Sequence, residues 1–115
     1  PLVEGTSLYG LAFEAWLINE VYRMNEILKQ DYALSFLQTR DGAEIDLILE
    51  RPGEPLIAIE IKSSTRVDEV EVAKLEDLAG DLGNVRIFYW SRDPFPKKIG
   101  KVECLPWEMG LKEIF

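Results

Sequence analysis

The sequence predicts an α/β domain in which helices pack against a central mixed sheet. Residues 44–62 alternate polar and apolar side chains through two short strands, and residues 85–90 (VRIFYW) are typical of a buried strand. Residues 8–28 and 67–82 carry apolar stripes of helical period. With 115 residues and 47% hydrophobic content, the chain suits one domain over residues 1–115.

The first predicted element is a helix over residues 8–28, which Thr6 or Ser7 can cap. Glu14 lies within its apolar stripe, where a carboxylate is costly unless it has a partner. Glu14 therefore leans out to solvent, pairs with an arginine, or belongs to a functional site.

A meander of three strands follows. Residues 32–40 alternate as a strand does, and Asp41-Gly42 is typical of a two-residue hairpin. The pairs that this hairpin predicts are Phe36 with Leu47 and Leu34 with Leu49.

The second turn, Arg51-Pro52-Gly53-Glu54, has the residues of a type II turn. A tight hairpin there would put the apolar residues of its two strands on opposite faces. We therefore expect a bulge or an odd-length loop near residues 52–55, which also brings Asp46 level with Glu60. The apolar face would then hold Ile45, Leu47, Leu49, Ile57, Ile59 and Ile61, and the charged face Glu44, Asp46, Glu60 and Lys62.

The remaining elements are a helix over residues 67–82, a strand over 85–90, an edge strand over 101–105 and a final helix over 107–115. The helix over 67–82 carries six acidic residues against one lysine, whereas residues 86–101 carry five basic residues against one aspartate. The sheet would have four to five strands.

Composition limits the chemistry. The chain has one cysteine, Cys104, and no histidine, which excludes an internal disulfide, histidine bases and nearly every zinc or iron site. A metal would have to be bound by oxygen, which favours Mg²⁺ or Mn²⁺. No apolar run is long enough for a membrane span and nothing resembles a signal peptide, so we expect no membrane partner and a cytoplasmic location. The net charge of −8 works against tight binding of nucleic acid.

Asp46, Glu60 and Lys62 suggest a hydrolytic site. Glu60 and Lys62 leave the same face of one strand roughly 7 Å apart, and Asp46 on the adjacent strand can converge with Glu60 on one divalent ion. An amine beside that ion could orient a water molecule and stabilise charge on a phosphate. A solvated sheet face is the plain alternative.

In this order, helix-borne Glu14, Asp46 after a hairpin and Glu60-Ile61-Lys62 resemble the PD-(D/E)XK nuclease superfamily. The segments GLAFE (10–14), GAEID (42–46) and IEIKSS (59–64), with a late Leu105-Pro106-Trp107, are similar to the nuclease-like C-terminal domain of uncharacterised archaeal and bacterial AAA-type ATPases. The resemblance implies a restriction-endonuclease-like α/β/α sandwich. Because the chain begins at Pro1 rather than Met, we expect a C-terminal fragment of a longer ATPase chain.

The resemblance also implies roles. Asp46 and Glu60 would be metal ligands, with the carbonyl of Ile61 a third, and Lys62 would be the catalytic lysine. Glu14 would bind or orient the metal, and Glu44 would substitute for Asp46 or assist it. Ile45 stands where the superfamily pattern has proline.

These residues are compatible with two functions. One is a Mg²⁺- or Mn²⁺-dependent endodeoxyribonuclease that cleaves DNA in preference to RNA as part of the ATPase. The other is a catalytically silent module that regulates the ATPase, docks a partner or forms a homodimer, which the acidic helix suits better than a DNA surface.

Overall fold

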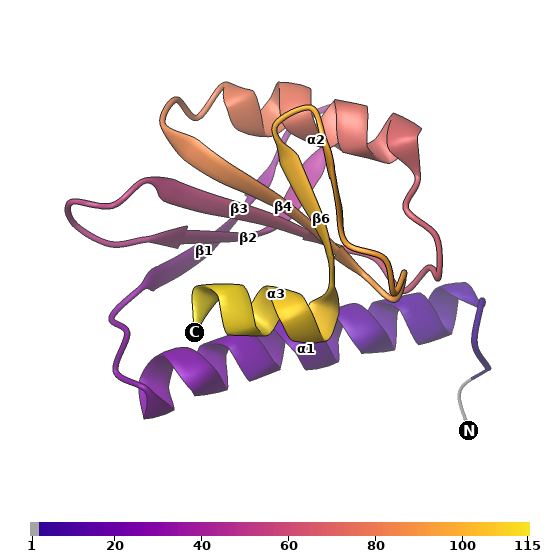
Figure 1. Cartoon of the computed structure of the whole chain (residues 1–115), viewed down its shortest axis with the longest axis horizontal. Helices are drawn as coiled ribbons and strands as arrows, with labels where there is room; N and C mark the ends of the chain where they lie inside the picture. Colours follow the sequence, from indigo (N-terminus) through magenta and orange to yellow (C-terminus); the bar gives the residue numbers. More distant parts are fainter. Residues whose placement is uncertain (1–2) are drawn as a thin grey trace.

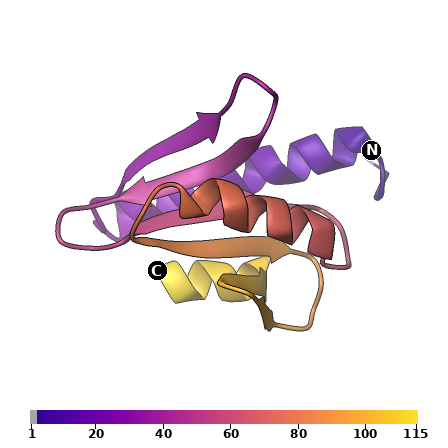
Figure 2. The same cartoon turned by 90° about the horizontal axis from the view of Figure 1, so that it is seen from above.

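The computed structural model describes residues 3–115, which form a six-stranded mixed sheet and three helices. In chain order the elements are α1 (Ser7–Ile27), β1 (Ala33–Gln38), β2 (Glu44–Glu50), β3 (Leu56–Ile61), α2 (Glu69–Gly80), β4 (Val85–Ser91), β5 (Lys97–Ile99), β6 (Val102–Pro106) and α3 (Trp107–Ile114). Figure 1 shows α2 on one side of the sheet and α1 with α3 on the other, and Figure 2 looks down onto α2. The predicted α/β class and mixed sheet are confirmed.

The strand order is β1-β2-β3-β4-β6-β5. Strands β1, β2 and β3 form an antiparallel meander. Strands β3, β4 and β6 run parallel to one another. The prediction of four to five strands was too low because β5 has only three residues, two of them lysines, and forms by pairing with β6. The strand expected at the edge, β6, therefore lies inside the sheet.

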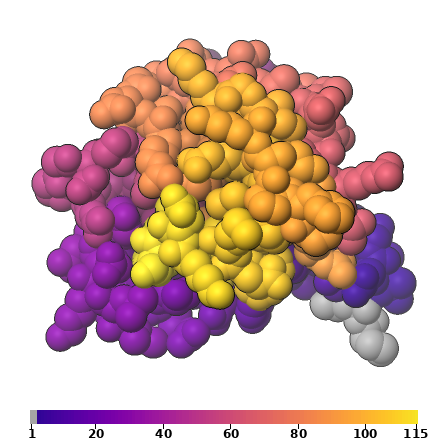
Figure 3. All heavy atoms as spheres, in the orientation of Figure 1, coloured from indigo at the N-terminus to yellow at the C-terminus, as the bar shows by residue number. Residues whose placement is uncertain are grey.

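Two apolar layers hold the sheet between its helices. On the α1 and α3 side, Leu17 and Leu111 meet a layer that includes Phe88 and Trp90. On the α2 side, Val72 and Leu75 of the helix pack on residues of β2, β3, β4 and β6. In the space-filling view of Figure 3, α3 and the β5–β6 segment cover the near face of the molecule.

Side chains define where the first two helices begin. The hydroxyl of Thr6 accepts a hydrogen bond from the Tyr9 N–H at 3.2 Å, which confirms the predicted start of α1. Asp68 caps α2 by accepting from the N–H groups of Val70 and Glu71, so this helix begins two residues later than predicted. Among residues 3–115, no helix combines the length and the apolar character that crossing a membrane requires.

The β2–β3 pairing confirms the predicted register. Leu47 faces Ile59 and Leu49 faces Ile57, which brings Asp46 level with Glu60. The loop between the paired ends, residues 51–55, has the expected odd length. Gly53 has φ 81° and the Glu54 N–H donates to the Arg51 carbonyl at 3.3 Å, as the predicted turn requires.

The β1–β2 hairpin differs from the prediction. Leu34 faces Leu49 as expected, but the turn has three residues, because Thr39 pairs with Ala43 across residues 40–42. The predicted pair of Phe36 with Leu47 is not a regular one. The pairs on either side of Phe36 are Ser35–Ile48 and Leu37–Ile45, so this one residue faces two, Asp46 and Leu47.

This two-against-one arrangement is a β-bulge in β2. Because an extra residue reverses the alternation of side chains, Ile45 packs in the α2 layer whereas Leu47 packs in the α1 and α3 layer. The expectation that Ile45 would share a face with Leu47 was therefore wrong. Phe36, opposite the bulge, is 70% exposed.

Candidate active site

The predicted site residues come together where β2 begins and β3 ends. Asp46 lies in the bulge of β2, Glu60 near the end of β3, Lys62 one residue beyond β3, and Glu14 midway along α1; all four are partly buried. One cavity, of about 270 Å³, is lined by Glu44, Glu60 and Lys62, with Glu71 of α2. Another, of about 200 Å³, is lined by Glu14, Glu44 and Asp46. Glu44 is exposed and borders both.

The bulge gives Asp46 a main-chain partner on the next strand. Its Oδ2 accepts a hydrogen bond from the N–H of Ile61 at 2.7 Å. Main-chain pairing between β2 and β3 runs only from Leu47 to Leu49. The Ile61 N–H lies beyond this paired segment and donates to the Asp46 side chain instead of to a main-chain carbonyl. The Ile61 main chain therefore lies against the Asp46 carboxylate; its carbonyl as a metal ligand stays a prediction.

The carboxyl groups of Glu14 and Glu60 both lie within hydrogen-bonding reach of Asp46. Burial raises the pKa of Asp46 to about 8, and the adjacent Glu60 carboxyl adds to the shift. Burial also raises the pKa of Glu14 to about 7, with further contributions from Asp46 and Glu44. The pKa of Glu60 is raised mainly by burial. Because two carboxyl groups can bond to one another only through a shared proton, Asp46 and Glu14 release their protons at higher pH than free carboxyl groups do.

Lys62 is held by α2. Its Nζ lies 2.9 Å from Oε2 of Glu71, and both side chains are about 40% exposed (39% and 38%). Burial acts to lower the pKa of Lys62, but the hydrogen bond to Glu71 and the charges of Glu60 and Asp46 outweigh it, so the pKa lies above its usual value. The ammonium is therefore fully charged at neutral pH.

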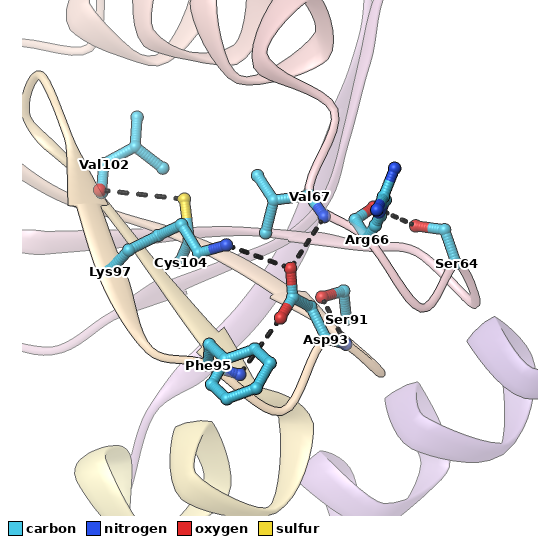
Figure 4. Close-up of polar contacts among 9 residues, drawn as sticks. All are labelled: Ser64, Arg66, Val67, Ser91, Asp93, Phe95, Lys97, Val102 and Cys104. Carbon is cyan, nitrogen blue, oxygen red and sulfur yellow. Dashed lines mark hydrogen bonds and ion pairs between the residues drawn. The ribbon is translucent and has the colours of Figure 1, made fainter.

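The segment after Lys62 is tied to the segment after β4. The N–H of Lys62 donates to the Trp90 carbonyl and that of Arg92 to the Ser64 carbonyl, each at 2.9 Å. Asp93 then accepts from the main-chain N–H of Val67 at 3.0 Å, from that of Phe95 and from Lys97 (Figure 4). These contacts fix the chain that carries Lys62.

Glu71 and Asp93 are functional candidates that the sequence analysis did not identify. Glu71 had a usable signal, because it shares a helical stripe with Leu75 and Leu78, as Glu14 does with its apolar neighbours on α1. Asp93 had no such sequence signal, since Asp-Pro is an ordinary loop dipeptide.

The donor set is suited to a hard cation, although it is not arranged as a ready-made cage. Among residues 3–115, no group of three Asp, Glu, Cys or His side chains is placed to hold one ion. Mg²⁺ commonly takes one or two carboxylates and keeps several waters. Asp46 and Glu60 lie side by side, partly buried and with raised pKa values, so they could supply these carboxylates, and a cation would compete with protons for them.

Comparison with known proteins gives one family. The family model described as a domain of unknown function, DUF4143, matches residues 9–108, a span that includes Glu14, Asp46, Glu60 and Lys62. Comparisons with curated proteins and with solved structures find no match.

Proposed function

We propose that this chain, which belongs to the DUF4143 family, is a metal-dependent nuclease. It would hydrolyse phosphodiesters of nucleic acid. DNA is preferred to RNA, and the domain acts as part of an AAA-type ATPase. One observation carries the proposal: the carboxyl groups of Glu14, Asp46 and Glu60 form one partly buried cluster, and Lys62 leaves the same strand end.

Asp46 and Glu60 would hold the cation, Mg²⁺ or Mn²⁺, with the carbonyl of Ile61 and the carboxylates of Glu14 and Glu44 around them. The bound ion would supply Lewis-acid stabilisation of the charge that develops on the phosphate. The hydrogen bond from Ile61 fixes one carboxylate oxygen of Asp46, and the other oxygen would bind the cation.

Lys62 supplies the second positive charge. Its ammonium remains charged at neutral pH, so it acts as a hydrogen-bond donor and not as a base. It would orient the attacking water and stabilise the phosphate oxygens. No histidine is needed for either task, in keeping with a chain that has none.

The arrangement of the elements supports one superfamily for this domain. A mixed sheet with helices on both faces, a carboxylate from the first helix, and Asp46 with Glu60 and Lys62 at one strand end support a PD-(D/E)XK domain of the restriction-endonuclease-like fold. The resemblance of residues 10–14, 42–46 and 59–64 to the C-terminal domain of AAA-type ATPases supports the ATPase context.

Nicking of supercoiled plasmid and cleavage of branched DNA by the purified chain, with Mg²⁺ or Mn²⁺, test the proposal. We expect Lys62→Ala to lower turnover about a hundredfold or more, since electrostatic groups at reacting phosphates contribute on that scale. Lys101→Ala, which removes the same charge from an exposed turn, serves as the control and should retain activity. Equal cleavage by wild type and Lys62→Ala would refute the proposed role of the lysine.

A catalytically silent regulatory or docking module is the second candidate, and the surface of the domain favours it in one respect. The side chains of Leu8, Leu11 and Tyr22 on α1 are 64%, 66% and 50% exposed, and Phe36 is 70% exposed. Cation binding without cleavage of plasmid, branched DNA or RNA would select this candidate, and a second copy or the ATPase would then be the partner to test.

A further inference from the structure

The ion pair between Lys62 and Glu71 links the candidate site to α2. Glu71 lies in the first turn of this helix, and its main-chain N–H is held by the Asp68 cap at 3.3 Å. Its carboxylate and the Lys62 ammonium line the same cavity as Glu60. The position of Glu71 is thus set by the start of a helix packed on the sheet, and not by a free loop.

Half-exposed ion pairs contribute little to stability, so the fold gives weak reason for this contact. The surroundings of Lys62 give a stronger reason for the ion pair. Its ammonium also feels the negative charges of Glu60 and Asp46, the two proposed cation ligands. If Glu71 were absent, these two carboxylates would be among the acidic partners left to the lysine, together with Glu44, which lines the same cavity.

A lysine ammonium and a divalent cation compete for the same carboxylate oxygens. An ammonium bonded to Glu60 or Asp46 would have to be displaced before a cation could bind. An acceptor on α2 that draws the ammonium away from those oxygens lowers this competition, while leaving the charge close enough to act on a phosphate.

We propose that Glu71 is a positioning residue that holds Lys62 on the α2 side of the cavity and so keeps Asp46 and Glu60 available to a divalent cation. This inference rests on the proposed metal site but not on cleavage.

Mn²⁺ titrated calorimetrically into the whole chain tests the inference. We expect Glu71→Gln to weaken Mn²⁺ binding roughly two- to fivefold, the scale of a half-exposed ion pair. Glu69→Gln is the matched control, since it removes the same charge from the same helical turn without contacting Lys62, and it should bind as wild type does.

The same substitution made in a Lys62→Met variant distinguishes positioning of the lysine from simple loss of the negative charge of Glu71. In Lys62→Met there is no ammonium to hold, so Glu71→Gln should leave Mn²⁺ affinity unchanged. If Glu71→Gln weakens binding equally in both backgrounds, Glu71 acts by its own charge and the inference is wrong. If wild type binds Mn²⁺ and Glu71→Gln binds it equally well, only this inference fails. No binding by wild type would overturn both the inference and the metal-dependent function.

Discussion

The carboxylate of Asp46 and the main-chain N–H of Ile61 are joined by a hydrogen bond of 2.7 Å. This contact ties the bulge in β2 to the last residue of β3, and it holds Asp46 within reach of both Glu14 and Glu60. The cluster is stable in this form only while some of its carboxyl groups are protonated or balanced by a cation.

The cation-free domain should lose stability as the pH rises from about 4 to about 8. The pKa of Asp46 is raised from 3.8 to about 8 and that of Glu14 from 4.5 to about 7, so the folded state binds more protons than the unfolded state in this window. The stabilising contribution is complete below the unfolded pKa values and is lost as the pH passes the folded ones.

Urea unfolding in EDTA at about pH 5 and about pH 8 measures this loss, which should be on the order of 2 kcal/mol. Asp46→Asn keeps an oxygen for the Ile61 N–H and removes the ionisable group, so it should reduce the difference between the two pH values. Glu54→Gln, in the exposed β2–β3 loop, should leave that difference unchanged. A wild-type free energy of unfolding that is constant or increases across this range would contradict the shared-proton cluster.

Gly110→Ala should destabilise the protein by about 1–3 kcal/mol, the usual cost of overpacking a core. A Cβ at Gly110 of α3 would lie 2.4 Å from ring atoms of Trp90, whose indole is fully buried. The clash outweighs the gain in helix propensity of about 1 kcal/mol. Thermal and urea unfolding measure the change.

Gly80→Ala provides the matched comparison, because Gly80 ends α2 and a Cβ there meets nothing within 4 Å. This change should leave the free energy of unfolding unchanged or raise it by up to about 1 kcal/mol. If both substitutions had the same effect, close packing of α3 on Trp90 would not explain the first.

The sequence predicted those features of the fold that depend on local signals. The Pro52-Gly53 turn and the parity of the apolar residues were sufficient for the β2–β3 register, and the cap at Thr6 was sufficient for the start of α1. Strand β5 was missed because three residues, two of them lysines, carry no periodic signal apart from their partner strand.

That the candidate residues lie near one another could be predicted from the sequence, but their geometry could not. Alternation of side chains identifies Asp46, Glu60 and Lys62, yet it assumes regular strands, and the bulge opposite Phe36 breaks that assumption. The ion pair of Lys62 with Glu71 depends on where α2 lies over the sheet, which no local pattern in the sequence encodes.

Asp93→Ala should lower the free energy of unfolding by about 1–3 kcal/mol at pH 7, because two main-chain N–H groups lose a charged acceptor. Hydrogen bonds from Phe95 and then Val67 lower the pKa of Asp93, so its stabilising effect is present above its ordinary pKa of 3.8 and is lost as the pH falls through the lowered value. Urea unfolding at neutral and acid pH measures both effects.

Asp77→Ala, at an exposed position on α2, should change stability by less than about 0.5 kcal/mol. If Asp93→Ala were equally mild, its hydrogen bonds would not anchor the segment that follows Lys62.

Calorimetric titration of Mn²⁺ into wild type and Asp46→Asn tests most directly whether Asp46 and Glu60, with Glu14 beside them, form a cation site. We expect saturable binding of Mn²⁺ to wild type, weaker binding to Glu14→Gln, and none to Asp46→Asn, while Glu54→Gln binds as wild type does. Wild type that binds no Mn²⁺, or Asp46→Asn that binds it equally well, would contradict the site on which the proposed function depends.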